Sequence, residues 1–96
     1  MYILNQSGTE IYNSEFFDHF LIADKPDAKL IVASKGRDVA PYTLGRYADM
    51  TEAREVIGSL YNSLRTGDAA FEMPLSEKMS AERTIYDKRT KRKGGS

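Results

Sequence analysis

The segment from residue 49 to residue 67 constrains the fold most, because it carries signals for both ends of a helix with an apolar stripe between them. Asp49 is a preferred N-cap residue, and Glu52 three positions later forms a capping-box pattern with Asp in the Ser/Thr role. Apolar residues recur at helical spacing at Ala53, Val56, Ile57, Leu60, Tyr61 and Leu64. Gly67 suits the position after the last turn. The sequence therefore predicts one amphipathic helix over residues 50–66.

The chain before this helix has the composition of short β-strands separated by turns. Residues 1–4 and 9–12 flank the polar segment Asn-Gln-Ser-Gly, which predicts a β-hairpin. Residues 16–23 fit either a helical face or a strand buried on both faces, and we favour the strand. Residues 29–34 and 42–47 predict two more strands with short antiparallel connections.

After the helix, residues 69–73 form one more candidate strand, which Pro74 closes at its end. Residues 76–88 contain good helix formers but few apolar residues, so a helix there needs a partner to be stable. We therefore predict an α+β fold, in which an antiparallel β-meander has one face covered by a single amphipathic helix. The predicted domain covers residues 1–75, and residues 76–96 form a C-terminal helix or flexible basic tail.

Charge divides the chain at the same point. Residues 1–75 hold seven Lys/Arg and eleven Asp/Glu, whereas residues 76–96 hold seven and three, which gives −4 and +4. Five of the six residues at positions 88–93 are basic, namely Lys88, Arg89, Lys91, Arg92 and Lys93. Clustered cations gain affinity for nucleic acid by releasing counterions, although an acidic body opposes approach to a duplex.

The side-chain inventory excludes several kinds of chemistry. With no cysteine, the chain has no disulfide, thiol nucleophile or Cys-ligated metal site. His19 is the only histidine, and its apolar neighbours predict a ring packed in or beside the core. No histidine or carboxylate spacing typical of a metal site occurs. We therefore expect no enzyme activity, no metal and no cofactor.

Two further segments are candidates for binding. Ser34-Lys35-Gly36-Arg37 places a glycine and two cations at a strand junction, which suits a phosphate but is more typical of a solvated hairpin tip. Tyr42, Arg46 and Tyr47 supply rings and a cation of the kind that hold single-stranded nucleic acid. Ordinary alternation in a half-buried strand gives the same pattern, and we favour that interpretation.

Three short motifs carry a family resemblance. The opening Met-Tyr-Ile-Leu-Asn-Gln, the step Leu44-Gly45-Arg46-Tyr47 before the helix, and Phe-Glu-Met-Pro at residues 71–74 resemble short proteins of phages and prophages of Gram-positive bacteria. Those proteins commonly begin M-[WY]-I-x-[NS]-Q and have an LG-x-[YF] step. The resemblance covers residues 1–74 and implies the sheet-plus-helix fold and a mobile-element origin. It carries no catalytic residue onto this chain.

Two functional classes follow from these observations. The first is a non-catalytic accessory protein that binds a macromolecule, such as an inhibitor of a host defence system like a CRISPR effector. The alternative is a nucleic-acid-binding accessory protein that uses the basic tail. We expect a protein rather than nucleic acid as the partner, and the sequence leaves a homodimer open. Without an apolar run long enough for a membrane span, we also expect no membrane contact and a cytoplasmic location in the bacterial host.

Overall fold

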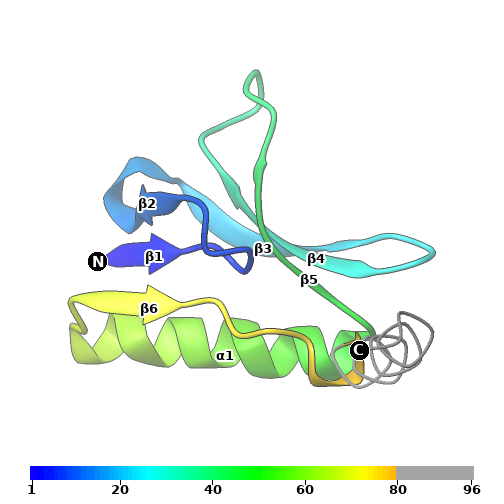
Figure 1. Ribbon diagram of the computed structural model, residues 1–96. Coiled ribbons are helices and arrows are strands. Elements are labelled where there is room, and N and C mark those ends of the chain that lie inside the picture. The colour runs from blue at the N-terminus through cyan, green and yellow to red at the C-terminus, as the bar shows by residue number, and fades with distance from the viewer. Residues whose placement is uncertain (80–96) are drawn as a thin grey trace, which may run out of the picture.

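The computed structural model describes residues 1–79, which form an α+β fold with one long helix, α1 (Met50–Thr66). Figure 1 shows α1 as a layer along one side of the strands, while the connection between β4 and β5 projects away from it. The predicted α+β class with one main helix is confirmed. The basic tail at residues 88–93 lies outside the described residues.

The strands form two three-stranded sheets, whereas the sequence predicted a single meander. The first has the order β2-β1-β6 and contains β1 (Tyr2–Leu4), β2 (Ile11–Asn13) and β6 (Ala70–Glu72). The second has the order β3-β4-β5 and contains β3 (His19–Asp24), β4 (Lys29–Ser34) and β5 (Tyr42–Tyr47). The predicted first hairpin is present as the antiparallel pair β1–β2. On its other side β1 pairs in parallel with β6. Strand β2 is the edge of this sheet, so the hairpin does not continue into the β3-β4-β5 meander.

The helix boundaries follow the sequence signals. The Asp49 carboxylate accepts the Glu52 N–H at 2.9 Å, and Gly67 ends the helix at a φ of 76°. The Glu52 side chain departs from the usual capping box, because it accepts the N–H of Ala48 rather than that of the N-cap residue. The predicted helix over residues 50–66 is confirmed at both ends.

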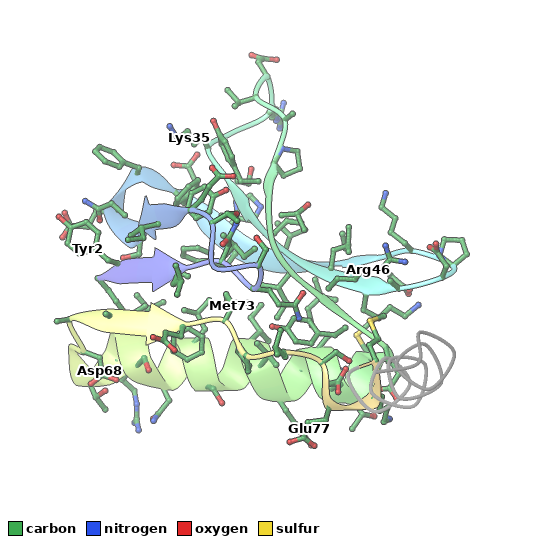
Figure 2. The ribbon with its side chains drawn as sticks, viewed as in Figure 1. Tyr2, Lys35, Arg46, Asp68, Met73 and Glu77 are labelled. Carbon is green, nitrogen blue, oxygen red and sulfur yellow. The ribbon has the colours of Figure 1, made fainter. Side chains whose placement is uncertain are left out.

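The core lies between α1 and the two sheets. Ala53, Val56 and Leu60 are the buried residues of the helix. They pack in one cluster with Ile3, Ile31, Ala33, Leu44, Tyr47 and Met73. Figure 2 shows Met73 between the strands and α1. The buried face of α1 is narrower than the predicted stripe, because Tyr61 and Leu64 stay exposed.

The segment before β3 differs from the strand predicted over residues 16–23. A short 3-10 helix, η1 (Ser14–Phe16), begins where the Asn13 side chain accepts the Glu15 N–H at 3.1 Å. This turn moves the start of β3 to His19 and directs Phe16 outward. Local side-chain capping competes here with extension of the strand.

Strand β5 contains an irregularity that decides which of its side chains are buried. The pairing with β4 shifts between Ile31 and Val32, which leaves an extra residue in β5. Leu44 and Tyr47 are consequently both buried although they are three positions apart. The Tyr47 ring packs against Gly45, where an added Cβ would lie 2.8 Å from the Tyr47 ring and hydroxyl. The LG-x-Y step is therefore a packing motif.

The described chain continues past the predicted domain boundary at residue 75. Ser76 is buried, and its hydroxyl donates to Glu52 Oε1 at 2.6 Å. Lys78 then forms an ion pair with Asp49. Residues 76–79 are thus fastened to the N-terminal end of α1. The division of residues 1–75 from residues 76–96 stays a prediction, because most of the second segment lies outside the described residues.

Candidate functional site

An aromatic hollow on the surface is the strongest candidate site in residues 1–79. It has a volume of about 310 Å³ and gathers side chains from four separate segments of the chain. Its lining residues, which we call the aromatic hollow, are Tyr2, Ile11, Tyr12, Asn13, Phe16, Phe17, Lys35 and Tyr42. Five of these eight residues are aromatic, and one is charged.

The rings of the hollow support one another through edge contacts. The Phe17 centroid lies 5.7 Å from that of Tyr42 and 6.0 Å from that of Tyr12. Tyr12 and Tyr42 are 5.8 Å apart. Tilted and edge-to-face pairs at these distances are favourable beyond the area they bury. The hollow is therefore a preformed surface, held by contacts between β2, the segment after η1, and β5.

Lys35 provides the single charge in the lining. Its Nζ lies 5.8 Å from the ring centre of Phe16, 5.9 Å from that of Phe17 and 5.7 Å from that of Tyr42. An ammonium at these distances is attracted by the ring faces. Figure 2 shows Lys35 near the base of the projecting β4–β5 connection. The ammonium is thus held beside the rings, and within residues 1–79 it has no carboxylate within ion-pair distance.

The outer rim of the hollow is apolar and exposed. Ile11 is 69% exposed, Phe16 is 67% exposed and Tyr42 is 37% exposed. Tyr2 is also exposed, on the neighbouring strand β1. Isolated apolar residues on a surface are ordinary, but a contiguous apolar group around a concave centre is typical of an interaction site.

The structure separates the three residues that the sequence grouped in β5. Tyr42 lines the aromatic hollow. Arg46 lies at the other end of the strand, with its side chain 3.5 Å from the Asp27 carboxylate. Tyr47 has an exposed fraction of 0%, and its hydroxyl donates to the Pro74 carbonyl at 2.7 Å. Of the three, Tyr47 therefore cannot stack on a base or partner, and Tyr42 and Arg46 do not form one surface.

Burial has a further effect on Tyr47. Desolvation, with the nearby Glu52 carboxylate, raises the pKa of the Tyr47 hydroxyl far above its ordinary value of 10.0. The group is therefore neutral across the physiological range and acts as a hydrogen-bond donor. Its role is structural, because it ties β5 to the segment that follows β6.

Two predicted binding segments remain, the basic tail and the glycine junction after β4. Lys88, Arg89, Lys91, Arg92 and Lys93 lie outside the described residues. In the junction after β4, Gly36 has a φ of 139° and its N–H donates to the Ser34 hydroxyl at 3.3 Å. This arrangement turns the chain at the end of β4, and it leaves Lys35 beside the rings.

His19 does not occupy the packed position that its neighbours predicted. It lies at the first position of β3 opposite Ser34, and its side chain is exposed. Within residues 1–79 the structure brings together no group of three or more His, Asp or Glu side chains suited to a metal ion. The absence of enzyme activity, metal and cofactor stays a prediction.

Sequence reasoning missed the hollow because its members are far apart in the chain. The sequence pattern places Phe16 on a strand buried on both faces, and it places Lys35 at a solvated hairpin tip. The signal that was available is the density of aromatic residues at positions 12, 16 and 17, since a single short strand cannot bury all three. Only the return of β5 beside η1 brings Tyr42 to the same place.

Comparison of the chain with protein-family models, with curated proteins and with solved structures gives no match. Within residues 1–79 the structure contains no helix that combines the length and the apolar character needed to cross a membrane. The aromatic hollow is therefore the feature of residues 1–79 that bears most directly on function.

Proposed function

We propose that this chain is a non-catalytic accessory protein of a phage or prophage that acts by binding a partner protein at the aromatic hollow. The observation that carries the proposal is the exposed apolar rim around a preformed, ring-lined centre. Large aromatic side chains in a pocket contribute most to protein interfaces. Inhibition of a host defence system, such as a CRISPR effector, is the form of binding that the phage resemblance favours.

The chemistry of the lining suggests what the partner presents. A protein segment with an aromatic or aliphatic side chain fits the ring-lined centre, and a carboxylate beside it fits the Lys35 ammonium. A charged group at the centre of an interface stabilises the complex when it meets its counter-charge. We therefore infer that the partner offers an apolar residue next to Asp or Glu.

The charge of the body favours protein over nucleic acid. Residues 1–79 contain eight Lys/Arg and twelve Asp/Glu, a formal side-chain charge of −4. A negative body repels the phosphate backbone, which dominates affinity for nucleic acid. Tyr42 is the one tyrosine of the predicted stacking pair that is exposed, because Tyr47 is buried.

A display selection tests the proposal. A random-peptide library is selected on the full chain, and binding of the recovered peptides is then measured on Phe16→Ser and Tyr42→Ala. The matched control is Leu75→Ser, because Leu75 is 61% exposed but lies after β6, outside the aromatic hollow. We expect peptides with an apolar residue beside a carboxylate, and a loss of affinity of about tenfold or more in both hollow variants but not in the control.

A charge reversal adds a second test, in which Lys35→Glu should lose the selected acidic peptides. Peptides that bind all variants equally would place the interface elsewhere and contradict the proposal. The alternative is tested by titrating DNA and RNA with salt. Binding that weakens steeply with salt, and that disappears when Lys88, Arg89, Lys91, Arg92 and Lys93 are replaced by Ser, would favour nucleic acid as the partner.

A biological assay links binding to defence. Plasmid interference by CRISPR effectors of Gram-positive hosts is measured with and without expression of the chain. If the proposal is correct, the wild type and Leu75→Ser protect the plasmid, whereas Phe16→Ser does not. Equal protection by all three would mean that the aromatic hollow has no part in it.

A further inference from the structure

A second uncovered apolar surface lies between α1 and β3. It encloses a groove of about 440 Å³, lined by Phe20, Ile57, Gly58, Leu60, Tyr61 and Leu64. Tyr61 and Leu64 are exposed, although their spacing places them in the apolar stripe of the helix. The groove shares no lining residue with the aromatic hollow. It is therefore a separate surface, and the proposed function does not account for it.

The sequence of this flank is arranged symmetrically about Tyr61. Gly58 lies three residues before it and Leu64 three after, while Arg54 lies seven before and Asp68 seven after. When two copies of a helix pack antiparallel about a twofold axis, residues equally spaced from the centre face each other. An axis at Tyr61 therefore sets Leu64 level with the partner's Gly58. Asp68 follows the Gly67 cap and lies just beyond α1, so the same axis brings it near the second helical turn of the other copy, which carries Arg54.

The contact between Leu64 and the partner's Gly58 is sterically open. An added Cβ at Gly58 would meet no atom within 4 Å, so the space beside Gly58 is open. A glycine at this position weakens the isolated helix relative to alanine. A Leu side chain from a second copy fits this space, because small residues allow close approach of two helices.

The charges at the two ends of the flank are complementary. Arg54 and Asp68 are both exposed, and within residues 1–79 neither has an ion-pair partner. Asp68 follows the last turn of α1, and Figure 2 shows it at that end of the helix. A carboxylate there is disfavoured by the negative end of the helix dipole, so a nearby cation stabilises it. Twofold pairing supplies one such cation at each end.

We propose that the protein forms a twofold dimer in which the α1 flanks of two copies pack antiparallel about Tyr61. The occupant of the groove is a second copy of this chain. The opposite charges of Arg54 and Asp68, which lie toward the two ends of α1, distinguish this occupant from an unrelated partner. The pair of contacts occurs twice, as a self-complementary interface requires.

Sedimentation equilibrium over a wide protein concentration range tests the dimer. We expect the wild type to reach twice the monomer mass, and Gly58→Leu to stay monomeric while keeping or raising its melting temperature. Arg54→Glu and Asp68→Arg should each raise the dimer Kd by about tenfold or more, since like charges then face each other. The double variant Arg54→Glu/Asp68→Arg should recover most of the loss.

The control is Glu55→Arg, an equal change of charge on a residue that lines a different hollow beside Pro74 and Glu77. It should dimerise as the wild type does. A wild type that is monomeric at every concentration would overturn the proposal. So would a dimer that is indifferent to Gly58→Leu and shows no recovery in the charge-swapped double variant. The charge swap keeps the test decisive even if Gly58→Leu does not fold.

Discussion

Gln6 binds both backbone groups of Arg46 through its side-chain amide. The Arg46 N–H donates to Gln6 Oε1 at 2.8 Å, and Gln6 Nε2 donates to the Arg46 carbonyl at 2.9 Å. The Gln6 N–H also donates to the Leu44 carbonyl at 2.8 Å. Gln6 thereby joins the end of the β1 segment to β5, which belongs to the other sheet.

This contact gives the opening motif and the LG-x-Y step a structural role. Ile3 of the opening motif is in the core, and Asn5 accepts the N–H groups of Thr9 and Glu10 to shape the hairpin turn. Gln6 then contacts the LG-x-Y step directly. The residues of the opening motif and of the LG-x-Y step therefore hold the two sheets together.

Removal of the Gln6 amide should destabilise the fold. Gln6→Ala loses the two bonds to Arg46 and a third, from Gln6 Nε2 to the Pro74 carbonyl at 3.2 Å. Each such hydrogen bond contributes about 0.5–1.5 kcal/mol, so for three bonds we expect a loss of about 1.5–4.5 kcal/mol in the free energy of unfolding in urea. The control is Ser7→Ala, which should change little, because the Ser7 hydroxyl is exposed and within residues 1–79 bonds only the Thr9 hydroxyl. Equal effects of the two substitutions would show that Gln6 does not join the sheets.

Two glycines should respond in opposite directions to an added methyl group. Gly45→Ala forces its Cβ to 2.8 Å from the Tyr47 ring, and Tyr47 is fully buried, so we expect a loss of about 1–3 kcal/mol. Gly58→Ala meets nothing and improves helix propensity, so we expect a gain of up to about 1 kcal/mol. Thermal melting at low protein concentration measures both. A neutral Gly45→Ala would mean that the Tyr47 ring does not pack as described.

Neighbouring positions on α1 should differ sharply in their contribution to stability. Leu60→Ala removes a side chain that is 1% exposed, and we expect a loss of about 2–5 kcal/mol. Tyr61→Ala alters an exposed residue and should change the stability of the monomer by about 0.5 kcal/mol or less. Urea unfolding below the dimer concentration range compares them. Similar losses at both positions would indicate that α1 is rotated relative to the sheets.

Acid should weaken the attachment of residues 76–79 to α1. Partial burial raises the pKa of Glu52, but hydrogen bonds from Ser76 and from backbone N–H groups, including that of Ala48, outweigh it and hold the pKa below its ordinary 4.5. A lowered folded-state pKa stabilises the fold above the unfolded-state pKa, and this stabilisation is lost as the pH falls through the folded-state pKa. Urea unfolding at neutral pH and below the Glu52 pKa should therefore show a smaller drop in Glu52→Gln than in the wild type.

The control for this acid effect is Glu55→Gln, on the exposed side of the same helix. It should keep the wild-type drop in stability, because Glu55 accepts none of the hydrogen bonds that Glu52 does within the described chain. If Glu52→Gln and the wild type lose stability in parallel, Glu52 is not the group that responds.

The sequence predicted the helix and several strand positions well because their signals are local. Asp49 and Gly67 act within one turn of the helix ends, and the strands at residues 29–34 and 42–47 are each bounded by polar breaks. The parallel pairing of β1 with β6 has no such signal. It depends on the helix carrying the chain back along β1, which is a property of the whole fold.

The candidate site was predicted only in part, for a related reason. Strict alternation in a strand places Tyr42 and Arg46 on one face of the sheet and Tyr47 on the other. The extra residue in β5 interrupts this alternation, so that Tyr47 is buried together with Leu44. Phe16 is exposed because the Asn13 side chain caps a 3-10 turn at this point, where an extended strand was expected. The spacing of hydrophobic residues does not indicate such a turn. Of the three residues predicted for stacking in β5, Tyr42 alone lies in the aromatic hollow.

The parallel pair β1–β6 sets the order in which the chain can finish folding on the ribosome. Tyr2 pairs with Ala70, so 68 further residues must be translated after Tyr2 before this pair can form. At about 5–20 residues per second this takes several seconds, during which the β1–β2 hairpin has no third strand. An isolated hairpin is marginally stable at best in water. The first sheet is therefore completed only after residues 70–72 have been translated, and until then β1 offers an open edge to other chains and to chaperones.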